Sequence, residues 1–168
     1  MSETKISQVF PTVLDNTCSL RELTRKAVGE GNLYNISLDI PFETLDCAMG
    51  NGGIMLPRLA PSLCWKGIEK FAHSLATEGY ILGNISELAQ FTRYYPEEIE
   101  KYSAVFALDE DSRWLNTDND ICVAYARIKG SRRCFSCYRF DHFLNPRDAV
   151  IIFQQAEHRA LALAQAVS

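Results

Sequence analysis

Apolar side chains recur at helical spacing in two early stretches of the chain. Ser19 and Glu22 have the spacing of a capping box, so a short helix is predicted to begin at Leu20. A second helix is predicted over residues 61–78, because a proline suits a first turn and a glycine follows the last apolar position. Its apolar stripe consists of Cys64, Ile68, Phe71 and Leu75.

Three more helices are predicted from their boundaries. Asn84 and Glu87 form another capping pair in front of an apolar stripe. Pro96 ends that helix, since the residue before a proline avoids helical angles, and it can begin a further short helix. The segment 156–167 is rich in alanine and leucine and is predicted to be the last helix.

Alternation of apolar and polar residues predicts the strands. The strictest alternation runs from Tyr34 to Ile40 and stops at Pro41, so a strand is predicted there. Four more strands are predicted over 104–108, 121–128, 133–140 and 149–153. The second and third of these four flank a tight turn at Gly130 and are predicted to pair as an antiparallel hairpin.

Helices thus dominate the first hundred residues and strands the next fifty. That segregation predicts an α+β fold in which an antiparallel β-meander of three to five strands packs against several short helices. The helices are expected to cover one face of the sheet. A length of 168 residues suits one globular domain over residues 1–168.

Composition narrows the compartment and the class of protein. Hydrophobic residues make up 47% and charged residues 23% of the chain, which is the balance of an ordinary globular domain. No apolar run approaches the roughly 20 residues that a membrane helix needs, and the first residues lack the pattern of a secretory signal. The six cysteines are widely spread. We therefore expect reduced, mainly buried cysteines and a cytoplasmic protein without membrane contact.

Charge is distributed unevenly along the chain. The net charge of −4 combines −8 over residues 1–120 with +4 over residues 121–168. Much of the positive charge gathers in the predicted hairpin, where arginines alternate with Tyr125, Phe135 and Tyr138. Arginine and tyrosine are favoured at protein interfaces, although a solvated hairpin is the simpler interpretation. If the hairpin binds a partner, together with the loop 141–148, the expected contact residues are Arg127, Arg132, Arg133, Tyr138 and Arg139.

A cysteine-dependent hydrolase is an alternative function. Cys64 would be the nucleophile, His142 the base and Asp148 the group that orients the base. The order of these residues and the Cys64-Trp65 pair resemble papain-like enzymes, although the Gly-Ser that precedes the cysteine in that family is missing. The position of Cys64 on a predicted apolar stripe favours burial and core packing instead.

The Cys134-Phe-Ser-Cys137 pair does not predict a metal or redox site. Residues three apart in a strand point to opposite faces, and the usual second pair of ligands is absent. No metal and no cofactor are therefore expected.

The function that these patterns favour is a non-enzymatic binding or regulatory domain that acts through a protein partner. The hydrolase is the first alternative. Nucleic-acid binding through the basic hairpin 127–139 is the second, and an isoelectric point near 5.4 argues against it.

Overall fold

The computed structural model describes residues 5–15, 17–45 and 53–167. Its helical elements are α1 (Leu20–Val28), η1 (Glu30–Asn35, 3₁₀), α2 (Phe42–Leu45), α3 (Ile68–Thr77), α4 (Ile85–Tyr94), α5 (Pro96–Glu100), η3 (Glu110–Ser112, 3₁₀) and α6 (Gln155–Val167). Its strands are β1 (Thr12–Leu14), β2 (Gly53–Met55), β3 (Arg58–Pro61), β4 (Lys66–Gly67), β5 (Tyr80–Leu82), β6 (Ala104–Ala107), β7 (Trp114–Leu115), β8 (Ile121–Lys129), β9 (Arg132–Arg139), β10 (Phe143–Leu144) and β11 (Asp148–Gln154).

One mixed sheet organises the chain. Strand β11 pairs antiparallel with β3 along one edge, and along the other edge it pairs parallel with β6 and then antiparallel with β5. Strand β8 pairs antiparallel with β6 and β7 along one edge and with β9 along the other. Strand β9 of the β8–β9 hairpin is therefore the last strand on that side of the sheet. The α+β class is confirmed. The strand order is less simple than a meander, because β11 returns to lie parallel beside β6.

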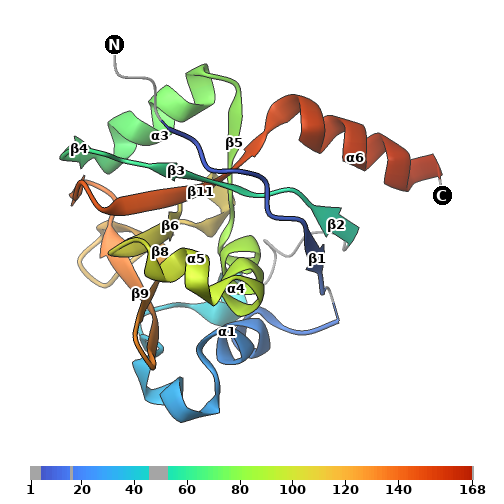
Figure 1. Cartoon of the computed structure of the whole chain (residues 1–168). Helices are drawn as coiled ribbons and strands as arrows, with labels where there is room; N and C mark the ends of the chain where they lie inside the picture. The colour runs from blue at the N-terminus through green and yellow to red at the C-terminus, as the bar shows by residue number, and fades with distance from the viewer. Residues whose placement is uncertain (1–4, 16, 46–52, 168) are drawn as a thin grey trace.

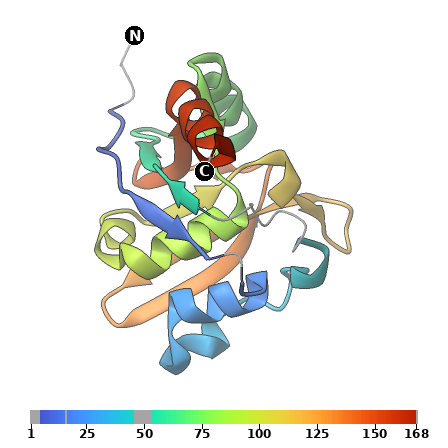
Figure 2. The same cartoon turned by 90° about the vertical axis from the view of Figure 1, so that its right-hand side faces the viewer.

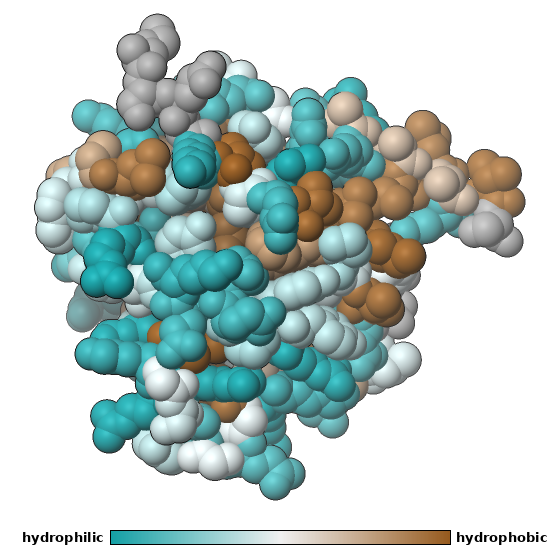
Figure 3. Space-filling model, viewed as in Figure 1, coloured by the Kyte–Doolittle hydropathy of each residue, from teal (hydrophilic) through white to brown (hydrophobic). Residues whose placement is uncertain are grey.

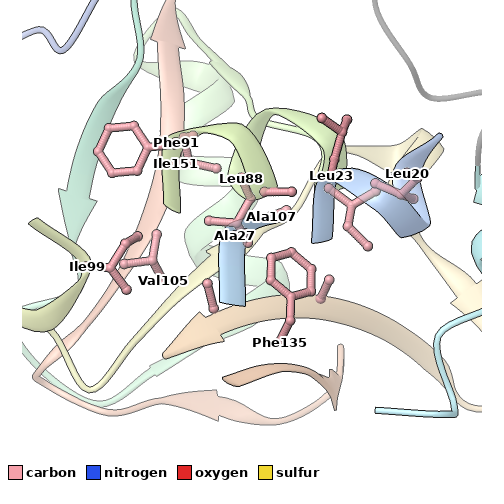
Figure 4. Close-up of a cluster of buried hydrophobic side chains, with 14 of the residues drawn as sticks. Leu20, Leu23, Ala27, Leu88, Phe91, Ile99, Val105, Ala107, Phe135 and Ile151 are labelled. Atoms are coloured by element: carbon pink, nitrogen blue, oxygen red, sulfur yellow. The ribbon is translucent and has the colours of Figure 1, made fainter. Parts of the chain in front are cut away.

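Helices cover both faces of this sheet, whereas the sequence led us to expect one covered face. Helices α1, α4 and α5 lie on one side and α3 on the other (Figures 1 and 2). The reason is that neighbouring residues of the central strands are apolar on both sides. Along β11, for example, Ile151 joins the core under α1 and α4 (Figure 4), whereas Val150 and Ile152 join the core under α3.

Both predicted helix caps are present. The Ser19 and Asn84 side chains each accept from the amide three residues on, and Glu22 and Glu87 complete the two capping boxes. The predicted start of the second helix was wrong. Residues 58–61 form β3 against β11, and α3 begins only at Ile68. An extended pairing partner for this segment, far away in the sequence, overrides the helical start that the proline suggested.

The strand predicted over 34–40 is absent. Residues 30–35 form the 3₁₀ turn η1, and only Ile36 makes a β-bridge, to Phe135. A half-buried strand would hide its alternate apolar side chains, but Tyr34 is 76% exposed and Leu38 is 97% exposed. Ile40 is buried in the core and Ile36 packs against it, so the four alternating apolar side chains do not share one buried face.

Helix α6 extends from the end of β11 away from the body of the molecule (Figure 1). Figure 3 shows apolar residues along it, and Leu163 and Val167 are exposed. Among the described residues, no helix has the length and apolar character that crossing a membrane requires.

Candidate functional site

Helix α3 leaves part of its face of the sheet uncovered. Its buried side chains, Ile68, Phe71 and Leu75, pack over the end of the sheet that carries Val150 and Ile152. Beyond the helix the same face is open and forms a hollow of about 370 Å³. Five aromatic side chains line this aromatic hollow: Trp65, Phe106, Tyr125, Tyr138 and Phe143.

Three rings from adjacent strands form the floor of the aromatic hollow. Phe106 of β6 stands opposite Tyr125 of β8 in the ladder, and their ring centroids are 5.3 Å apart. Tyr138 of β9 meets Phe106 edge-on at 6.2 Å. Burial raises the pKa of the Tyr125 phenol, so this side chain is a neutral hydroxyl at physiological pH. The floor is therefore apolar apart from phenol groups that can form hydrogen bonds.

Two exposed rings form the wall. Trp65 is 70% exposed and Phe143 is 62% exposed. Just before Trp65, Leu63 adopts φ of 62°, a left-handed conformation that costs a residue with a side chain about 1–2 kcal/mol. The buried Ser62 fixes this loop, since its hydroxyl donates to the Asn145 carbonyl and its amide donates to the Asp148 carbonyl at 2.9 Å.

Asp148 holds the turn that borders the aromatic hollow. Its carboxylate accepts from the Asn145 amide at 2.8 Å. Burial raises the pKa of this carboxyl group, and hydrogen bonds from the Asn145 and Ala104 backbone oppose that rise. The same turn fixes Arg147, whose amide donates to the Asn145 side chain at 2.7 Å while its carbonyl accepts from Ser103 at 2.7 Å. The main visible role of Asp148 is thus structural.

A second, basic hollow of about 290 Å³ adjoins the aromatic hollow and shares Ser103 and Arg127 with it. Lys129 and Arg147 also line this basic hollow. Glu100 lines the same hollow, and its carboxylate accepts from the Gly130 amide at 2.8 Å. Together the two hollows form one depression, aromatic at one end and cationic at the other.

The five predicted partner-binding residues separate into two groups. Arg127 and Tyr138 line the aromatic hollow, and Arg132 is exposed near the hairpin tip. Arg133 instead donates to the Ala27 carbonyl at 3.3 Å, near the end of α1. Arg139 is held by Asp141 at 2.7 Å and Asp120 at 3.5 Å. Only the first group is available to a partner without breaking an interaction within the chain.

The predicted hydrolase residues lie in different arrangements. Cys64 is exposed in the loop before α3, which corrects the expectation that it lies on the buried stripe of that helix. The ring of His142 packs edge-on against Tyr138 at 4.8 Å, and its carbonyl accepts from Ile68. No hydrogen bond within the described part of the chain joins Cys64 to His142 or Asp148.

The five cysteines in the described residues are all free thiols, and Cys47 lies outside those residues. Cys137 packs against the core under α1, whereas Cys134 stands opposite Arg127 in the ladder, on the other face of the sheet. Burial raises the pKa of both thiols. Within the described ranges, no three ligating side chains gather where they could hold a metal ion.

Sequence reasoning missed Phe106 as part of the site and considered Trp65 only as a neighbour of Cys64. A signal was available in β8. The side chains at 123, 125, 127 and 129 share a face, and they change from valine through tyrosine to arginine and lysine. That change along one face indicates a sheet that is covered at one end only.

The chain matches no known protein-family model, no curated protein and no solved structure.

Proposed function

We propose that this chain is a non-enzymatic binding domain that acts through a protein partner, and that its contact surface is centred on the aromatic hollow. One observation carries the proposal. Trp65, Tyr138 and Phe143 are exposed together around a concave site that also contains Arg127. Tryptophan, tyrosine and arginine are the residues most enriched at interface hot spots.

The geometry of the aromatic hollow supports binding by a rigid surface. Its floor stands on three paired strands, and its wall loop is tied to the 145–148 turn through Ser62. Binding then requires little ordering of the chain, which reduces the entropic cost of association. Strain at Leu63 in the same loop also points to a functional constraint there.

The tip of the hairpin has a smaller part in this proposal than the sequence suggested. Arg133 and Arg139 already have partners inside the chain, so removing them for a ligand would cost those interactions. Arg132 is exposed but lines neither hollow.

We rank the Cys64–His142 hydrolase below binding, because a nucleophile and its base need hydrogen-bond reach and no contact between these two side chains supports it. Nucleic-acid binding ranks third.

We also propose a cytoplasmic location, since the free thiols suit a reducing compartment.

The test is to capture proteins from a nuclease-treated lysate with the immobilised chain and to quantify them by mass spectrometry. We expect Trp65→Ala and Tyr138→Ala to lose a set of proteins that the wild type retains, because removing a hot-spot side chain weakens binding by about 2 kcal/mol or more. Tyr34→Ala is the matched control, since Tyr34 is 76% exposed on η1, outside the residues that line either hollow. Identical sets from all four proteins would contradict the proposal, and thermal melts would exclude misfolding as a cause.

A further inference from the structure

The open face of β8 changes in chemistry along its length. Tyr125, Arg127 and Lys129 project from this face in order, from the aromatic hollow into the basic hollow. Four residues of strand span about 13 Å, which is also the length of about four residues of an extended peptide. A segment lying along β8 would therefore meet rings first and cations two to four residues later.

The cations of the basic hollow are not neutralised within the described chain. Arg127, Lys129 and Arg147 form no ion pair there, whereas neighbouring Lys101 pairs with Glu98 at 2.7 Å and Arg139 with Asp141 at 2.7 Å. The carboxylate that borders the hollow, Glu100, is engaged by the Gly130 amide. Three positive charges thus outnumber the one exposed carboxylate of the depression, that of Glu100, and the carboxyl group of Asp148 at the aromatic end is buried.

We infer that the partner segment is an acidic, extended stretch, with an apolar side chain in the aromatic hollow and carboxylates in the basic hollow. This inference rests on the proposed function and names the chemistry of the partner. Charge complementarity supports it, because the patch is positive on a chain of net charge −4.

Three cations match the two or three carboxylates of such a segment. Proteins that track a nucleic-acid backbone use longer rows, commonly about 6–10 phosphate contacts. Farther along β9, Arg139 is already paired with Asp120 and Asp141, so it does not extend this row of cations. A short acidic peptide is therefore favoured over a nucleic acid.

The experiment measures fluorescence anisotropy of two labelled octapeptides with the full chain. The acidic probe has one phenylalanine, a glycine and then three glutamates. The neutral probe has glutamines in place of the glutamates. Because exposed ion pairs contribute modestly, three of them are expected to make the acidic probe bind roughly tenfold tighter at low salt. This preference is expected to shrink as salt screens the charges.

The variant combining Arg127→Gln, Lys129→Gln and Arg147→Gln is expected to abolish the preference. The matched control, Lys5→Gln with Lys70→Gln and Arg159→Gln, removes the same number of exposed charges elsewhere and is expected to keep it. Circular dichroism verifies folding, and Lys129→Gln alone, a change at an exposed residue, is expected to lose part of the preference.

Equal binding of the two probes, or an equal loss in the control variant, would overturn the inference. A thymidine decamer that binds more tightly than the acidic probe would overturn it in favour of a nucleic acid. Trp65→Ala tests the proposed function separately, since it is expected to weaken both probes alike. A charge preference that persists while Trp65→Ala has no effect would contradict the aromatic hollow as the anchor and leave acid recognition standing.

Discussion

Truncation of two aromatic residues of β9, three positions apart, is expected to affect different properties of the protein. One truncation mainly lowers stability, and the other mainly weakens binding. Phe135 is completely buried in the core under α1 (Figure 4), and it stands opposite Ala126 in the β8–β9 ladder. Tyr138 lies on the other face of the sheet and is 41% exposed at the floor of the aromatic hollow. Phe135→Ala therefore tests the core, and Tyr138→Ala tests the proposed binding surface.

The expected magnitudes follow from burial. Removing a fully buried phenylalanine ring loses its transfer free energy and leaves a cavity, which costs about 3–5 kcal/mol. At this chain length, that loss corresponds to a fall in melting temperature of roughly 6–20 °C. Tyr138 loses only the partial burial of its ring and its edge contacts with Phe106 and Tyr125, so about 1–2 kcal/mol is expected.

The assay is urea unfolding followed by circular dichroism, with the free energy of unfolding and the m value fitted for each protein. Both variants are expected to keep the wild-type m value, because neither changes the surface exposed on unfolding by much. Phe135→Ala is expected to retain the preference for the acidic probe at temperatures where it is folded, whereas Tyr138→Ala loses probe affinity. An equal or greater loss of stability in Tyr138→Ala would refute the assignment of the two faces of β9.

Three further predictions follow from other parts of the chain. Burial raises the pKa of Glu87 to about 7, so the folded state retains a proton that the unfolded chain has lost above about pH 4.5, and stability falls as pH rises through this window. Glu87→Gln, which keeps an acceptor for the cap, is expected to remove that loss of about 1–3 kcal/mol, measured by urea melts at pH 5 and pH 8. Exposed Cys64 is expected to react with iodoacetamide in the folded protein, whereas Cys122, at 4% exposure, is expected to react only on unfolding; mass spectrometry that finds the reverse order would contradict these placements. Arg132→Glu is expected to leave stability within about 0.5 kcal/mol, whereas Arg133→Glu loses the hydrogen bond to α1 and about 1 kcal/mol, and thermal melts of the two single variants would separate them.

Some elements were predictable because their signals are local. A capping box lies within four residues, so both helix starts at Ser19 and Asn84 could be predicted from the sequence and are confirmed. The hairpin is likewise local, since Gly130 adopts φ of 59° in the turn between β8 and β9, where glycine has no steric penalty. The α+β class followed from the separation of helical and strand patterns along the chain.

Other features depend on partners that are distant in the sequence. Residues 58–61 are extended because β11, about ninety residues later, pairs with them, whereas residues 34–40 make a single β-bridge, at Ile36. The site depends on tertiary contacts even more strongly. Trp65 comes from the loop before β4 and Phe106, Tyr138 and Phe143 from three different strands, and they form a hollow only because α3 leaves that part of the sheet uncovered. The sequence by itself determined which short segments begin helices and turns, because those interactions involve neighbouring residues. Which side chains remain exposed together was decided only by packing, because burial of one face depends on where a distant helix ends.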